Sequence, residues 1–191
     1  MNQTISMPVL QGYKMQLLTP AHLPQMLGLQ EEVLEWLGPE KQNYLVPNTS
    51  ESFTKYFFGP NKAIGVFRDE RLVAQAMVAF IMPGIENKKL TNCSAAKKII
   101  DKHSAFAVIG GILVKPSDHG KKLMQMMLEE TKTHYHAWPI IGEVAIGNDP
   151  SENSFLKAGF ENIGEGMDYS DYCCLCFMQY YPKQLPPAVK P

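Results

Sequence analysis

The sequence has almost no net charge. Its 191 residues carry 18 lysines and arginines against 19 aspartates and glutamates, a formal charge of −1. Such a chain has no overall positive field to attract nucleic acid or an anionic membrane surface, so we expect neither as a partner. It also lacks a run of about 18 uninterrupted apolar residues, the length that spans a membrane, and a basic leader followed by an apolar stretch. These absences predict a soluble, cytoplasmic protein that binds small molecules or modest protein surfaces.

Cysteine is scarce and poorly arranged for cross-linking or metal binding. Of the four cysteines, Cys93 stands alone and the others crowd into the segment CCLC at 173–176. A zinc site prefers ligand pairs on two separate turns, which this pattern does not provide. His134 and His136 lie at a predicted helix end, where the helix dipole favours them without any metal. We therefore expect reduced, partly buried cysteines and no metal site.

The composition suits one globular domain of ordinary size, because 45% of the residues are hydrophobic and 19% are charged. We expect a single domain over residues 1–181, interrupted by a polar insertion at 83–104. The last ten residues, 182–191, are rich in proline and predict a loose tail.

Hydrophobic periodicity and capping residues predict the first half of the chain. Residues 13–18 form a strand, and a helix follows with Thr19 as N-cap and Pro20 at its first position. A shorter helix is capped by Ser50, with three phenylalanines expected in the core, and Gly59-Pro60 ends it. Two apolar runs at 62–82, joined across 68–71, predict a β-hairpin. The phenylalanines are Phe53, Phe57 and Phe58.

The second half alternates strands and helices. The insertion includes a short helix that begins near Ser94, and the continuous apolar run 105–114 is typical of a strand covered on both faces. A helix opening near Gly120, a strand at 139–146, a helix at 151–160 with Ser151 as N-cap, and two more strands follow. The methionines of the helix near Gly120 are expected to pack in the core. This order predicts an α/β fold with a mixed central sheet of about seven strands flanked by helices.

The segment VKPSDHGKKLMQMML, residues 114–128, joins a buried strand to an amphipathic helix. The first turn of a helix has backbone N–H groups without partners and the positive end of the dipole, so this turn can bind an anion. Many strand-to-helix turns of α/β proteins look similar and bind nothing, so both interpretations stay open from the turn alone.

Two motifs in the stretch 105–160 resemble the GNAT superfamily of acetyl-CoA-dependent N-acetyltransferases. The family's turn motif V-x-P-x-x-R-G-x-G-(I/L)-G is matched by Val114, Pro116, Gly120 and Leu123, whereas His119, Lys122 and Met124 replace its arginine and two glycines. The family's motif N-x-x-A-x-x-L-Y-x-K-x-G-F is matched in register by a second set, Asn148, Ser151, Phe155, Lys157, Gly159 and Phe160.

The resemblance implies the GNAT acyl-CoA N-acyltransferase fold, with acetyl-CoA as the cofactor. The backbone amides of His119, Gly120, Lys121, Lys122, Leu123 and Met124 would hold the pyrophosphate of coenzyme A. Lys121 and Lys122 could also reach a phosphate as point charges, or Lys122 could obstruct it. The pantetheine arm would pair with the backbone of Ile112, Leu113 and Val114, where the two central strands splay. Asn148 would bind the arm through its side chain, and Ser151 and Phe155 belong to the same cofactor-binding set.

The resemblance also implies the catalytic group. Glu143 lies five residues before Asn148, a spacing similar to that of GNAT members that acetylate protein N-terminal amines, where a glutamate acts as base. An exposed glutamate on a strand is the alternative. Phe155 stands where the family usually has the tyrosine that protonates the thiolate, so Tyr135, Tyr169 or Tyr172 would have to replace it, or water would serve. A structural role is the more common one for such part-buried tyrosines and is the favoured interpretation of each.

We therefore expect an N-acetyltransferase that acts on a primary amine of a small molecule or peptide. The alternative is a catalytically silent GNAT-like module that binds coenzyme A or a partner protein. The acceptor pocket is expected between the first two helices, the 83–104 insertion and the last hairpin, and a homodimer is left open.

Overall fold

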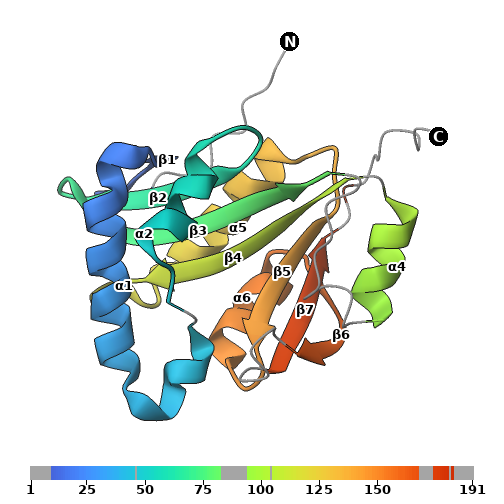
Figure 1. Ribbon diagram of the computed structural model, residues 1–191. Helices are drawn as coiled ribbons and strands as arrows, with labels where there is room; N and C mark the ends of the chain where they lie inside the picture. The colour runs from blue at the N-terminus through green and yellow to red at the C-terminus, as the bar shows by residue number, and fades with distance from the viewer. Residues whose placement is uncertain are drawn as a thin grey trace.

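A computed structural model describes residues 10–45, 47–82, 94–103, 105–167, 174–180 and 182. These contain a seven-stranded sheet in the order β1-β2-β3-β4-β5-β7-β6. All neighbouring strands are antiparallel except β4 and β5, which are parallel. The predicted mixed sheet is thus confirmed (Figure 1). The strands are β1 (Lys14–Leu17), β2 (Lys62–Arg68), β3 (Arg71–Ile81), β4 (Phe106–Val114), β5 (Ile140–Ala145), β6 (Glu161–Met167) and β7 (Cys174–Tyr180).

Helices cover both faces of this sheet. On one face, α1 (Leu23–Leu37) and α2 (Ser50–Thr54) pack over β2 to β4 (Figure 1). On the other face lie α5 (Leu123–His134) and α6 (Asp149–Lys157), and α4 (Ser94–Lys102) packs near β6. Short 3-10 turns accompany them: η1 (Pro20–His22), η2 (Pro39–Tyr44), η3 (Lys55–Phe57) and η4 (Pro116–Asp118).

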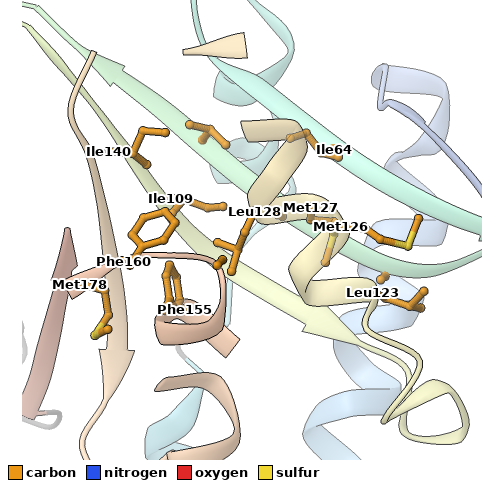
Figure 2. Close-up of a cluster of buried hydrophobic side chains, with 14 of the residues drawn as sticks. Ile64, Ile109, Leu123, Met126, Met127, Leu128, Ile140, Phe155, Phe160 and Met178 are labelled. Carbon is orange, nitrogen blue, oxygen red and sulfur yellow. The ribbon is translucent and has the colours of Figure 1, made fainter. Parts of the chain in front are cut away.

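The largest apolar cluster lies between the sheet and α5 (Figure 2). Leu123, Met127 and Leu128 of α5 are almost completely buried and belong to the same cluster as Ile109 of β4. Burying side chains of this size stabilises the fold by roughly 2 kcal/mol each. The helical spacing predicts this packing for most of the methionines of α5. The structure confirms it for Met126 and Met127, whereas Met124 is only partly buried.

Three local predictions were wrong. The α2 helix is capped by Thr49, whose hydroxyl accepts from the Ser52 N–H, and not by Ser50. Helix α6 begins earlier than expected and is capped by Asn148 instead of Ser151. Phe58 is 66% exposed, because the helix changes to the turn η3 and the chain is already extended at Phe58.

Some predictions fall outside the described residues. These include most of the insertion (83–93), the tail from 183 onward, Tyr169, Tyr172, Cys93 and Cys173. The helix expected within the insertion is present as α4. Among the helices that the structure describes, none combines the length and the apolar character needed to cross a membrane.

Candidate functional site

The two central strands separate halfway along their length. The parallel pairing of β4 with β5 joins Ala107–Ile109 to Ile140–Gly142 and goes no further between these described strands. At the point of separation β4 contains a bulge, since its register with β3 shifts and Gly111 adopts a φ of +55°. Glycine takes this conformation without steric cost, and a bulge bends its strand. Ile112, Leu113 and Val114 therefore follow the bulge along the open gap, as the resemblance had implied.

The turn after β4 presents free backbone donors. Gly120 has a φ of +76° and Lys122, the N-cap of α5, has a φ of 59° with no side-chain cap. Within the part of the chain that the structure describes, the N–H groups of Gly120, Lys122, Leu123 and Met124 have no hydrogen-bond acceptor. We call residues 119–124 the phosphate turn, because such a set of N–H groups at a helix N-terminus favours an anion.

A hollow of about 510 Å³ opens beside the phosphate turn. Its lining combines the turn and the start of α5 with Ser154 and Lys157 of α6: Gly120, Lys122, Leu123, Met124, Gln125, Ser154 and Lys157. Two lysines and no carboxylate line it, so its charge suits a phosphorylated ligand. Sequence reasoning had not placed Ser154 and Lys157 in the site, although Lys157 belongs to the second motif.

His119 and Lys121 do not line this hollow. The His119 Nε2 lies 3.0 Å from the Val114 carbonyl oxygen, and its ring packs edge-on against Trp36 of α1, with centroids 4.7 Å apart. His119 thus connects the phosphate turn to the last residue of β4 and to α1.

Glu143 lies at the start of the splay. It directly follows Gly142, the last residue of β5 paired with β4, and its side chain is half-buried. Its Oε2 lies 3.9 Å from the position that a Cβ on Gly110 would occupy. The carboxylate therefore reaches across the gap toward the bulge of β4.

The segment between α1 and α2 covers the same region. The buried Gln30 carboxamide holds Asn48 by two bonds: its Nε2 donates to the Asn48 carbonyl (3.0 Å) and its Oε1 accepts from the Asn48 N–H (2.7 Å). The Tyr44 hydroxyl donates to the carbonyl of Gly147, just beyond β5 (2.9 Å). Gln30, Asn48 and Tyr44 were not predicted as part of the site. The one sequence feature that could have indicated them is a glutamine, Gln30, on an otherwise apolar face of α1.

Asn148 is held at the start of α6. Its Oδ1 accepts from the Ser151 N–H at 3.4 Å, which is an N-cap bond, and its side-chain amide nitrogen has no acceptor among the described residues. The capping role and a role toward the pantetheine arm use different atoms, so one does not prevent the other.

Phe155 is part of the core. It is 1% exposed, packs edge-on against Phe160 at 5.0 Å, and fills the space that a Cβ on Gly142 would need. Tyr135, one of the expected replacements for a proton donor, is also engaged: its hydroxyl donates to the Pro60 carbonyl at 2.6 Å, and burial raises its pKa to about 12. Its structural interpretation fits this placement.

No cluster of three or more histidine, cysteine, aspartate or glutamate side chains suited to a metal occurs among the described residues. His134 instead lies 3.2 Å from a Glu130 carboxylate oxygen, and His136 lies 3.2 Å from the Thr133 carbonyl oxygen.

No protein-family model matches the sequence, and no curated protein matches it significantly. The fold, in contrast, has many solved counterparts. A ribosomal-protein-S5-alanine acetyltransferase from Vibrio fischeri superposes with a TM-score of 0.65 at 10% identity, covering 93% of this chain and 97% of that one. Arabidopsis thaliana NAA60, solved with acetyl-CoA, gives 0.64 at 11% identity over 88% and 97% of the two chains.

RimL, a ribosomal L7/L12 alpha-N-protein acetyltransferase solved with coenzyme A, gives a TM-score of 0.60 at 17% identity over 91% and 96% of the two chains. A GNAT-family acetyltransferase from Streptococcus pneumoniae gives 0.64 at 13% identity. At identities this low, the superpositions establish the fold and nothing beyond it. That fold is the one predicted from the two motifs.

Proposed function

From the GNAT acetyltransferase fold, which this chain has, we propose that the protein is an N-acetyltransferase that moves an acetyl group from acetyl-CoA to a primary amine. The observation that carries the proposal is the combination of a splayed β4–β5 pair with free N–H donors at the phosphate turn. The gap between the splayed strands would receive the pantetheine arm, and the N–H donors would bind the diphosphate of the same cofactor molecule.

The phosphate turn and its hollow would bind the phosphates. The N–H groups of Gly120 and Lys122 to Met124 would donate to the diphosphate, and Lys122 and Lys157 would add positive charge from either side of the hollow. The pantetheine arm would pair with the backbone of Ile112 to Val114. The Val114 carbonyl can accept a second bond besides the one from His119, because a carbonyl oxygen has two lone pairs.

Glu143 would act as the base. The amine nitrogen would attack the thioester carbonyl carbon, and its proton would pass to the Glu143 carboxylate directly or through water. The C–S bond would then break, and coenzyme A would leave as thiolate. Phe155 has no proton to give, so the thiolate would take its proton from water. Backbone N–H groups at the β4 bulge would stabilise the negative charge that develops on the carbonyl oxygen.

The acceptor is proposed to be a primary amine of a peptide or a small molecule. A peptide end is supported by the spacing of Glu143 and Asn148, which resembles that of N-terminal acetyltransferases. It is also supported by two structural counterparts that are acetyltransferases of ribosomal proteins. Asn48 and Tyr44 lie on the acceptor side of Glu143 in this proposal.

Thermal unfolding in increasing acetyl-CoA tests the cofactor. A ligand bound only by the folded state raises the unfolding temperature with concentration, so we expect a graded rise. Thiol release over a panel of peptide and small-molecule amines then tests catalysis, with Glu143→Gln as the control. Turnover that persists unchanged in Glu143→Gln would remove Glu143 from its role as base.

The second candidate is a catalytically silent module of the same fold. It is favoured by Phe155, a buried ring without a proton to donate, and by Lys122 in place of a glycine. A thermal shift with acetyl-CoA but no thiol release over the whole amine panel would support a module that binds coenzyme A. No shift at millimolar acetyl-CoA would support a module that binds only a partner protein.

A further inference from the structure

A completely buried carboxylate lies at the entrance to the phosphate turn. Asp118, the last residue of η4, is 0% exposed and accepts three side-chain hydrogen bonds. They come from the Tyr13 hydroxyl (2.7 Å), from Arg68 (2.6 Å) and from the Ser117 hydroxyl (2.8 Å). A buried charge is costly unless it is paired and hydrogen-bonded, and here both conditions are met.

These bonds connect the phosphate turn to a distant part of the sheet. Tyr13 directly precedes β1, and Arg68 is the last residue of β2, so the side chain of Asp118 is fixed to the far strands of the sheet. Its backbone is bonded within the turn: the Asp118 N–H donates to the Lys115 carbonyl (2.8 Å), and the Lys121 N–H donates to the Asp118 carbonyl (3.3 Å).

The hydrogen bonds of Asp118 therefore influence the backbone conformation in which the phosphate turn exposes its N–H groups. Lys122 has the left-handed φ of 59°, which a residue with a Cβ adopts only at a cost. Contacts elsewhere must hold such a conformation, and the Asp118 bonds lie four residues before Lys122, directly before the phosphate turn. A turn that is already fixed before the ligand arrives loses less conformational entropy on binding.

We propose that Asp118 is a positioning residue for the diphosphate of coenzyme A: bonded to Tyr13 and Arg68, it holds the phosphate turn in its binding conformation. The inference rests on the proposed function. Neither Asp118 nor its partners lines the hollow, so the effect passes through the backbone of the turn.

Charge alone would give the opposite effect, which makes the proposal testable. A carboxylate close to a diphosphate repels it, so neutralising Asp118 would tighten binding if the turn kept its conformation. Two positive charges lie around the carboxylate, those of Arg68 and Lys115, and the titratable Tyr13 hydroxyl donates to it. Asp69 is a further charge close to Arg68. If Asp118 positions the turn, its removal weakens binding in spite of the lost repulsion.

The experiment is calorimetric titration of coenzyme A into the wild-type protein and three variants. Asp118→Asn should weaken binding by about tenfold. Tyr13→Phe removes the hydroxyl that donates to Asp118 and accepts a long bond from Arg68 (3.4 Å), keeps the Asp118 charge, and should weaken binding by a smaller factor. Asp101→Asn removes an equal charge from the exposed end of α4 and should leave the affinity unchanged. In turnover, Asp118→Asn should raise the KM for acetyl-CoA and leave kcat unchanged.

Thermal unfolding without ligand separates positioning from simple stabilisation. A lower unfolding temperature with an unchanged or tighter affinity for coenzyme A in Asp118→Asn overturns the inference. If Asp118→Asn does not fold, an unchanged affinity in Tyr13→Phe overturns it equally. Wild-type protein that does not bind coenzyme A at millimolar concentration overturns the proposed function instead, so the two failures are distinguishable.

Discussion

Asn48 and Glu143 lie over the same face of the β4 bulge. The Glu143 Oε2 is 3.9 Å from the Cβ position of Gly110, and the Asn48 Nδ2 is 3.7 Å from that of Gly111. Ile109 packs on the α5 side of the sheet, so its neighbour Gly110 faces the α1 side, because successive strand residues alternate between faces. A Cβ on Gly111 would contact Met77, which belongs to the apolar cluster under α1. A carboxylate and a carboxamide thus converge on the point where the strands separate.

This pair predicts a separation of roles between the two residues. Asn48→Ala should raise the KM for the acceptor amine by roughly threefold to tenfold, the effect of one lost hydrogen bond, with the KM for acetyl-CoA unchanged. Glu143→Gln should lower kcat instead. Steady-state kinetics with both substrates varied provides the measurement. An Asn48→Ala variant with wild-type kinetics would place the acceptor elsewhere.

Lys122 combines a strained backbone with a cation beside the phosphates. Lys122→Gly should stabilise the free protein by about 1 kcal/mol, because glycine adopts the left-handed conformation without a Cβ penalty. We expect it nevertheless to weaken coenzyme A binding about threefold to tenfold through the lost charge. Lys121→Ala is the matched control, since it removes an equal charge that does not line the hollow. Tighter binding by Lys122→Gly would mean that the lysine obstructs the phosphates.

Gly142 and Phe155 should be energetically coupled. A Cβ on Gly142 would overlap the ring of Phe155, which is fully buried and cannot move freely. Gly142→Ala should therefore cost about 1–3 kcal/mol of unfolding free energy, as overpacking usually does. In the Phe155→Leu background the same change should cost much less. Urea unfolding of the four proteins measures the coupling, and strictly additive effects would contradict the contact.

The sequence predicted those parts of the site that depend on local pattern. The buried run before the phosphate turn, the helix after it, and the position of Glu143 five residues before Asn148 are all features of contiguous segments. Periodicity therefore predicted β4 and α5 correctly. The two wrong N-caps have a local cause as well, because Thr49 and Asn148 compete with the serines that follow them and are equally good caps.

The contacts that span the chain could not be predicted in this way. Asp118 is 105 residues from Tyr13, and Tyr44 is 103 residues from Gly147. No periodicity relates such pairs, because they meet only when the sheet has formed. The sequence around Asp118 carries no signal of burial, and only the folded structure shows that this carboxylate is buried beside Arg68 at the end of β2.

The acid stability of the protein should depend on Asp118. Burial by itself would raise the pKa of this carboxyl, but the hydrogen bonds from Tyr13 and Ser117 and the charges of Arg68 and Lys115 outweigh it and hold the pKa below its ordinary value. A carboxyl whose pKa is lower in the folded than in the unfolded state stabilises the fold above its unfolded pKa of about 4. That contribution disappears as the pH falls through the lower, folded value.

Unfolding free energy measured from pH 7 downward should therefore fall below about pH 4 more steeply in the wild-type protein than in Asp118→Asn, which has no carboxyl to titrate. Asp101→Asn, whose carboxylate forms an exposed pair with Lys97, should keep the wild-type slope. Because an exposed pair contributes little to stability, equal slopes in all three proteins would mean that the Asp118 carboxylate is not held ionised by its neighbours.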